Sequence, residues 1–225
     1  MKQKQVLFLS SWYPSKNNPN LGNFVQRHAE AANEHAQVTA LFVTSSNHVE
    51  KLTVEKEVVN GVETFIAYYP KVKGKLPFLT VLKKFRRYID ASKYAFEIIG
   101  KNFDLVHLNI TYPAGLFALW LKKKKQIPYV LTEQWTGYLS IKGDFKKLSS
   151  LQQVQHARIF KHAEMIFPVS DHLGKALVNH GLISTYKVLH NVVNHELFFP
   201  AEQEKSTFQF IHVSTFDDVT NNAVT

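Results

Sequence analysis

The sequence predicts an α/β fold, a Rossmann-like parallel sheet with helices on both faces. The first observation behind this prediction is the alternation of short apolar runs with amphipathic segments of about 10–20 residues, which is typical of β-α-β units. The second is size, because 225 residues of which 45% are apolar are enough to bury a core. The third is the absence of cysteine, which excludes a fold held together by disulfides.

In the N-terminal part of the chain, apolar runs and helical spacing alternate as this fold requires. The expected elements are, in order, the strand Val6–Ser11, a helix from Phe24 to His35, the strand Gln37–Thr44, the hairpin Glu57–Tyr69 and the helix Pro77–Ile99. Asn23 is the expected N-cap of the first helix, since asparagine often caps helices. Asn60-Gly61 is the expected hairpin turn, because this dipeptide favours positive φ angles.

The alternation continues to about position 190. The expected elements are the strand Asp104–Asn109, the helix Pro113–Lys125, the strand Ile127–Glu133, a loop over Trp135–Phe145, the helix Ser149–Ala163, the strand Met165–Ser170, the helix Asp171–His180 and the strand Tyr186–Asn191. Ser170 is expected to cap the helix that follows it, and Gly181 to end that helix.

The C-terminal part of the chain departs from this alternation and predicts a change of domain. We expect a Rossmann-like domain over residues 1–200, a polar linker over 201–207 and the start of a truncated second domain over 208–225. The last segment contains the strand pattern FQFIHVST with no helix after it. An alternative is that this strand docks on the first domain.

Composition and missing motifs exclude several function classes. There is no P-loop, no G-x-G-x-x-G fingerprint and no G-x-S-x-G elbow. The absence of cysteine excludes a thiolate zinc site, and we expect no metal site. No apolar run is long enough for a signal peptide or a membrane span, so the default expectation is a cytoplasmic protein. The net charge of +9 favours anionic partners.

The candidate functional site is the rim formed by the loops that follow the strands, because ligands of open α/β sheets bind at the carboxyl ends of strands. This rim is rich in aromatic, amide and hydroxyl side chains, a composition that suits a sugar. The candidate binding residues are Gly22, Asn23, His107, Asn109, Gln134, Trp135, Tyr138, Ser170 and Asn191. Glu133 is expected to be structural, since neighbours on a strand face opposite ways, and a packed core role competes with a site role for His107.

Two features of the rim and the surface concern anions. Gly22-Asn23 at a helix start would offer free backbone N–H groups to a phosphate, unless Gly22 only supplies a tight turn. Lys83, Lys84, Arg86 and Arg87 lie on the polar side of the Pro77–Ile99 helix and form either a solvated face or a docking surface for anionic membrane. Nucleic acid is a weaker alternative, because no recognition motif accompanies the charge.

The loops in their order resemble the N-terminal half of a family 4 glycosyltransferase of the GT-B type. The resemblance is carried by the segments VLFLSSWYPSKNNPNLGNFVQRHAEAAN, FDLVHLN, IPYVLTEQWTGY, HAEMIFPVSDHLGKAL and KVLHNVVNHELFFP. It implies two Rossmann-like domains facing a cleft and a metal-independent, retaining transfer from a nucleotide-sugar to a glycan or lipid-linked acceptor, without a bound cofactor. It also implies that Gly22 lies near the donor phosphates and Asn191 near the hinge.

The chain departs from the family pattern at several positions. Gln134 stands where the family usually has histidine, Asn194 replaces the aspartate of the N-G-V-D turn, and Asn221-Asn222 stands where a Lys-Asn pair is expected. The glutamates that hold the donor would lie in the second half, so this chain alone is expected to be inactive. The alternative is a non-catalytic Rossmann-like interaction module. A coding sequence that continues into a segment with the pattern E-x-x-x-x-x-x-x-E would favour the transferase instead.

Overall fold

The computed structural model describes residues 3–74, 77–141, 143–200 and 210. The chain divides into two units, Met1–Val193 and Asn194–Thr225, and the sheet lies in the first. The predicted linker over 201–207 and the predicted second-domain segment over 208–225 lie outside the described residues, apart from Phe210. The strand expected within FQFIHVST therefore stays a prediction.

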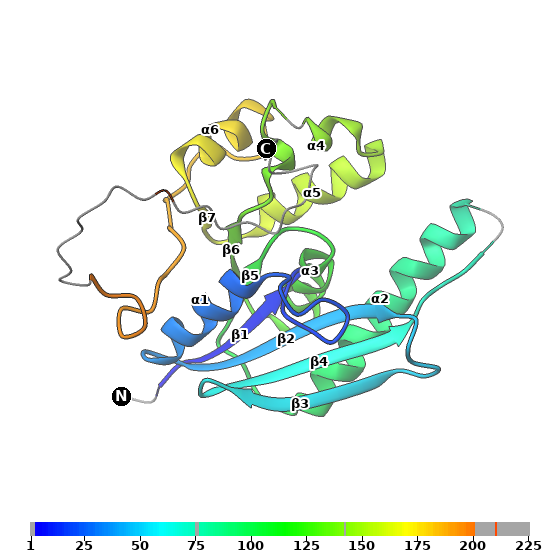
Figure 1. The fold of residues 1–225 in the computed structure, drawn as a ribbon. Helices are drawn as coiled ribbons and strands as arrows, with labels where there is room; N and C mark the ends of the chain where they lie inside the picture. The colour runs from blue at the N-terminus through cyan, green and yellow to red at the C-terminus, as the bar shows by residue number, and fades with distance from the viewer. Residues whose placement is uncertain (1–2, 75–76, 142, 201–209, 211–225) are drawn as a thin grey trace. The chain divides into compact units, whose positions relative to one another are not determined.

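The first unit is built on one sheet of seven strands in the order β3-β4-β2-β1-β5-β6-β7 (Figure 1). The strands are β1 Gln5–Ser10, β2 Gln37–Ser46, β3 Thr53–Val59, β4 Val62–Pro70, β5 Leu105–Asn109, β6 Tyr129–Glu133 and β7 Ile166–Pro168. All neighbours pair in parallel except β3 and β4, which form the predicted hairpin. The carboxyl ends of β1, β5 and β6 therefore meet at one edge of the sheet.

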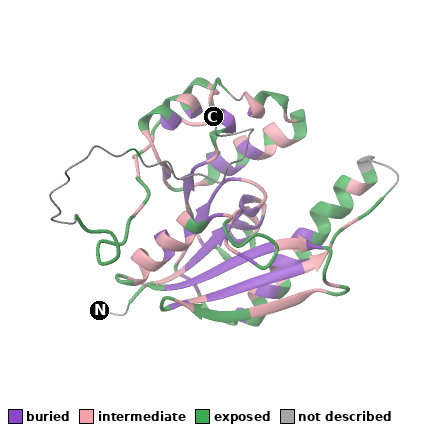
Figure 2. Cartoon of the chain, viewed as in Figure 1, coloured by how far each residue is buried: buried purple, intermediate pink, exposed green. Residues whose placement is uncertain are grey.

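Helices cover both faces of this sheet, as predicted. They are α1 Asn23–Asn33, α2 Pro77–Ile99, α3 Ala114–Lys125, the short η1 Thr136–Tyr138, α4 Asp144–Lys147, α5 Ser150–His162 and α6 Asp171–Asn179. Along β1, Phe8 packs in the cluster that contains α1, whereas Leu7 and Leu9 pack in the cluster that contains α2 and α3. This alternation is the period-2 pattern of a strand buried on both sides, and the central strands are buried along most of their length (Figure 2).

Local signals in the sequence account for several element ends. Asn60 and Gly61 have φ angles of 48° and 82°, which is the positive-φ turn predicted for the hairpin. Ser170 caps α6 by accepting a hydrogen bond from the backbone N–H of Leu173. Gly181 follows α6 with a φ angle of 67°, as expected for a glycine that ends a helix.

Three local predictions are wrong. Asn23 is not the N-cap of α1; Gly22 is, without a side-chain hydrogen bond, because its φ angle of 70° suits glycine. Tyr186–Asn191 is not a strand, because only the N–H groups of residues 187 and 189 bond to β7. The loop predicted over Trp135–Phe145 instead contains η1 and the start of α4.

Candidate functional site

A pocket of about 200 Å³ lies at the carboxyl ends of β1, β5 and β6. Three loops and one helix form its walls, so residues far apart in the sequence meet there. The lining residues are Trp12 after β1; Ile110, Thr111 and Tyr112 after β5; Glu133, Trp135 and Tyr138 at the end of β6; and Leu148, Gln152 and His156 from the α5 region. Parallel pairing brings these loops together, because it aligns the ends of the strands at one edge.

Glu133 holds two of the loops together. Its side chain is fully buried, and its carboxylate accepts hydrogen bonds from the backbone N–H groups of Thr111, Gln134 and Trp135 at 2.8–3.0 Å and from the Thr111 hydroxyl. Burial raises the pKa of Glu133, and these four donors oppose the rise. The carboxylate thus fixes the loops after β5 and β6 relative to each other, which is a structural role.

Aromatic rings form the main wall of the pocket. The rings of Trp135 and Tyr138 meet edge to face with centroids 4.8 Å apart, and the Tyr112 ring stacks on His156 at 5.5 Å. Gly137 permits this arrangement, because a Cβ at that position would overlap the Trp135 indole. The half-buried Trp135 and Tyr112 keep part of their surface free, as required of rings on which a ligand stacks.

Tyr138 and His156 form a buried neutral pair. The Tyr138 hydroxyl lies 2.7 Å from Nδ1 of His156. Burial raises the pKa of Tyr138 well above its usual value and lowers that of His156 to about 4. At neutral pH the hydroxyl therefore donates to an uncharged imidazole, and the pair packs the floor of the pocket without carrying charge.

Two predicted site residues carry buried polar atoms that have no hydrogen-bond partner within the described part of the chain. These atoms are Oδ1 of Asn109 and Nε2 of Gln134. Asn109 ends β5, and Gln134 directly follows β6. A buried polar atom without a partner destabilises the folded state by about 1–3 kcal/mol, so such atoms often mark a place that water or a ligand satisfies.

The N-terminus of α1 adjoins the Trp12 side of this site. A Cβ on Gly22 would overlap the backbone carbonyl of Trp12, so only glycine allows the loop to close against residue 12. Among the described residues, the N–H groups at positions 22–24 have no hydrogen-bond acceptor, and Asn23 is exposed. The start of α1 therefore has the free donors of an anion site.

The remaining predicted site residues make contacts outside the pocket. Nε2 of His107 lies 2.7 Å from the Thr132 hydroxyl, its ring packs on Phe8, and burial lowers its pKa to about 3. Ser170 uses its hydroxyl to cap α6. Asn191 places Oδ1 3.1 Å from Nε2 of His28. These side chains are already engaged with other parts of the protein.

The contribution of α5 to the pocket was not predicted from the sequence. Gln152 and His156 lie four residues apart and so project from one side of this helix. His156 is 4% exposed, and its position in the same stripe as buried Ile159 and Phe160 was the available signal. A polar residue in an apolar helical stripe indicates either a core contact or a site, and position alone does not separate these.

Two other features, a metal-binding cluster and a membrane-spanning helix, are absent from the described residues. Within residues 3–74, 77–141 and 143–200 there is no group of three or more histidine, aspartate or glutamate side chains placed to hold a metal ion. In the same part of the chain, no helix has the length and apolar character needed to cross a membrane.

Comparison with known proteins gives a family and a distant structural likeness. A family model of Glycosyltransferase Family 4 matches residues 21–197. The crystal structure of CalG4, the calicheamicin glycosyltransferase, matches with 13% sequence identity and a TM-score of 0.41, over 75% of this chain and 48% of the CalG4 chain. The chain thus spans about half the length of that protein. No curated protein sequence matches it.

Proposed function

Because the chain belongs to Glycosyltransferase Family 4, we propose that it is the acceptor-binding half of a retaining, metal-independent glycosyltransferase. In this proposal a sugar moves from a nucleotide-sugar donor to a glycan or lipid-linked acceptor. Donor binding depends largely on a second domain, so this chain alone has no transferase activity. The protein works without a cofactor.

The aromatic pocket is the observation that carries this proposal. Trp12, Tyr112 and Trp135 offer ring faces on which a sugar ring stacks, and amide and hydroxyl groups at the strand ends suit sugar hydroxyls. Asn109 and Gln134 do not line the pocket, but they directly precede its lining residues Ile110 and Trp135 in the sequence, and their unpartnered atoms are an acceptor and a donor. Glutamine at 134 hydrogen-bonds without taking a charge, unlike the histidine usual in the family, so this contact is independent of pH.

The start of α1 is the proposed contact with the donor phosphates. Its free N–H groups and the helix dipole favour an anion, whereas the missing side chain of Gly22 lets the loop close against Trp12. The dipole contributes only about 0.3–1 kcal/mol at an exposed site, whereas millimolar binding needs about 4 kcal/mol. This end of α1 therefore orients a diphosphate that other residues bind.

The fluorescence of the tryptophans tests the acceptor site. Titrating the protein with a panel of mono- and disaccharides should give a saturable change that Trp135→Phe reduces, because Trp12 remains in the pocket. Trp120→Phe is the matched control, because Trp120 lies on α3 outside the pocket, against Phe117 and Lys93. No response to any saccharide, or equal loss in both variants, would overturn the acceptor site. Release of nucleotide from a nucleotide-sugar by this chain alone would contradict the assignment of the donor site.

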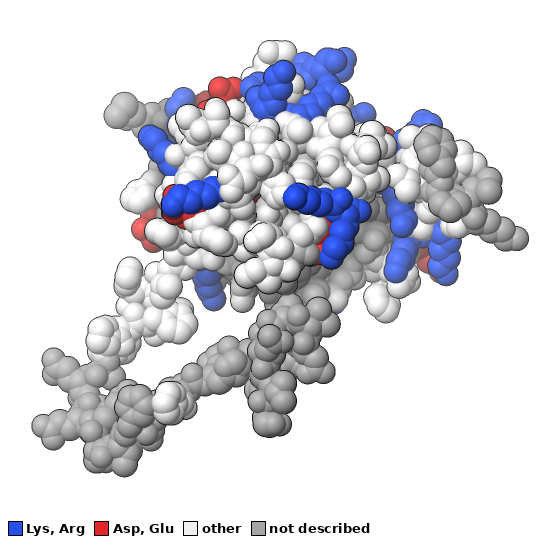
Figure 3. Space-filling model, turned by 90° about the horizontal axis from the view of Figure 1, so that it is seen from above, with Lys and Arg blue, Asp and Glu red and all other residues white. Residues whose placement is uncertain are grey.

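We further propose that the protein is cytoplasmic and attaches reversibly to the inner membrane face. Lys83, Lys84, Arg86 and Arg87 are all exposed on α2, and each cation near an anionic surface contributes about 1 kcal/mol. In Figure 3 lysine and arginine outnumber acidic side chains on the visible face. Sedimentation with anionic liposomes at low salt is the test, and failure to bind would refute the attachment.

A further inference from the structure

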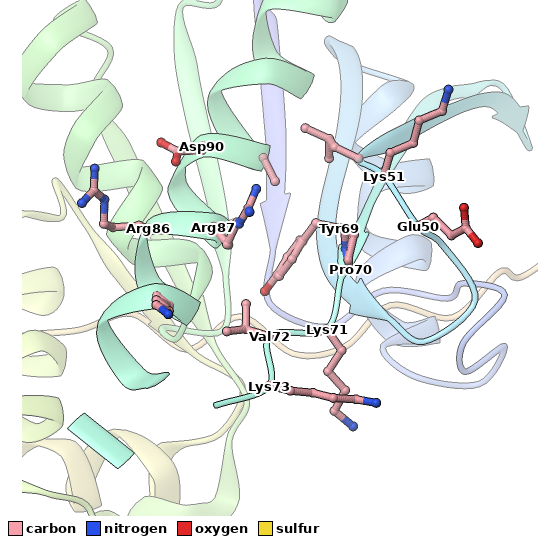
Figure 4. Close-up of a pocket in the computed structure, with 13 residues that line it drawn as sticks. Glu50, Lys51, Tyr69, Pro70, Lys71, Val72, Lys73, Arg86, Arg87 and Asp90 are labelled. Atoms are coloured by element: carbon pink, nitrogen blue, oxygen red, sulfur yellow. The ribbon is translucent and has the colours of Figure 1, made fainter. Parts of the chain in front are cut away.

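A second and larger cavity lies on α2, away from the aromatic pocket, with which it shares no lining residue. Its volume is about 770 Å³. Three separate segments form it: residues 50–52 after β2, residues 69–73 at the end of β4, and residues 83–91 of α2 (Figure 4). The cavity therefore depends on the packing of three segments and is not a feature of one helix face.

The cavity is strongly basic. Its lining residues include six cations and two carboxylates. The cations are Lys51, Lys71, Lys73, Lys83, Arg86 and Arg87, and the carboxylates are Glu50 and Asp90. None of these six cations forms a salt bridge within the described residues, whereas Lys16 in the loop after β1 and Lys56 on β3 pair with Glu55 and Glu63. Within the described residues, the cavity therefore keeps an excess of positive charge over these two carboxylates.

The arrangement of the cations favours a bound ligand over a merely solvated face. Arg87 extends into the gap between α2 and Tyr69, and Lys71 and Lys73 extend from the segment after β4 (Figure 4). Cations from two other segments line the same cavity as the α2 cations, which a solvated face of one helix would not require. Leu52 and Val72 add apolar wall beside the charges, so the cavity suits a ligand with an anionic group and a less polar part.

We propose that this cavity binds a phosphate or diphosphate group carried by the acceptor; that the carrier is a glycosyl acceptor rests on the proposed function. A compact group with two or three negative charges matches the excess of cations, and arginine binds phosphate oxygens through two parallel hydrogen bonds. A cavity of this volume holds a diphosphate together with part of the molecule attached to it.

Titration calorimetry with inorganic pyrophosphate tests the site. Arg87→Gln and Lys71→Gln are each expected to weaken binding about fivefold or more. Lys124→Gln is the matched control: it removes the same charge from α3, where Lys124 is exposed and does not line the cavity. Its affinity should change less than about twofold. No binding by the unmodified protein, or equal weakening by all three variants, would overturn the proposal. The three side chains are exposed, so the variants should remain folded.

Two further measurements identify the source of the phosphate. Monomeric short-chain phosphatidic acid competes with pyrophosphate if the group belongs to a lipid, whereas a soluble sugar phosphate competes if it does not. Either result supports the cavity, and competition by neither would contradict an acceptor-borne phosphate. The saccharide titration reports on Trp135 and not on the cavity. Loss of saccharide binding alone would therefore count against the aromatic pocket, and loss of pyrophosphate binding alone against the basic cavity.

Discussion

At the residue scale, Glu133 determines the shape of the aromatic pocket, because its carboxylate is bonded to the loops that form the pocket. Its carboxylate is fully buried and accepts four hydrogen bonds from the loops after β5 and β6. Three of those donors are backbone N–H groups, which would otherwise lack partners. The position of Trp135 therefore depends on an acidic residue that the ligand does not need to touch.

Replacing Glu133 by glutamine should destabilise the protein by about 3 kcal/mol. The amide retains one acceptor oxygen but turns an N–H₂ group toward backbone donors, leaving buried groups unpaired. Urea unfolding measures the loss. The control is Glu97→Gln, because Glu97 is exposed on α2. A change at position 133 as small as that at 97 would refute the structural role.

At the scale of elements, α3 and α5 pack closely because Gly115 lacks a side chain. A Cβ at position 115 would lie 2.6 Å from Cγ2 of Ile159. Ile159 is fully buried, so it cannot move aside into solvent. Since α5 supplies Gln152 and His156 to the pocket, this helix contact also sets the position of one pocket wall.

Gly115→Ala should therefore lower the free energy of unfolding by about 2 kcal/mol, as overpacked core substitutions do. In an Ile159→Ala background the added methyl group enters vacated space, so the same substitution should be neutral or stabilising. A double-mutant cycle by urea unfolding gives the coupling energy. Additive effects of the two substitutions would show that the α3–α5 contact does not cause the loss.

Helix and strand signals in the sequence were sufficient for most elements, and the family resemblance is confirmed over residues 21–197. The errors have local causes. At the start of α1, the close approach of Gly22 to Trp12 overrides the capping preference of Asn23. Tyr186–Asn191 has a strand-like sequence but makes only two backbone bonds to β7. Both outcomes depend on tertiary contacts that neighbouring residues in the sequence do not encode.

At the scale of the whole molecule, the sequence could predict only those candidate site residues that follow a strand of the sheet. The rule that ligands bind at strand ends made Trp135 and Tyr138 candidates, because each follows a recognisable strand, and both line the aromatic pocket. It gave no means to predict His156, which reaches the pocket from a helix, or the basic cavity, whose cations come from three segments. It also selected Ser170 and Asn191, whose side chains bond to α6 and to His28.

Three histidines distributed over the molecule are held uncharged by burial. The pKa of His156 is lowered to about 4, that of His107 to about 3, and that of His28 is also lowered. All three are packed among sheet, α1 and α5 residues, so the same burial that stabilises the fold disfavours their protonation. The stability of the whole domain is therefore linked to pH through these side chains.

The free energy of unfolding should fall as the pH is lowered from about 6.5 toward 4. In this window the unfolded chain binds protons at its histidines, whereas the folded chain does not until the pH reaches the lowered pKa values. Stability due to neutral His156 is thus complete above pH 6.5 and lost progressively below it, by up to roughly 3 kcal/mol. Urea unfolding across this range measures the slope.

Buried Glu133, whose pKa is raised, contributes with the opposite sign, so the comparison of variants isolates the histidine. His156→Gln should flatten the curve, whereas His35→Gln, at an exposed position, should retain it. Equal slopes in both variants would mean that His156 does not link folding to pH.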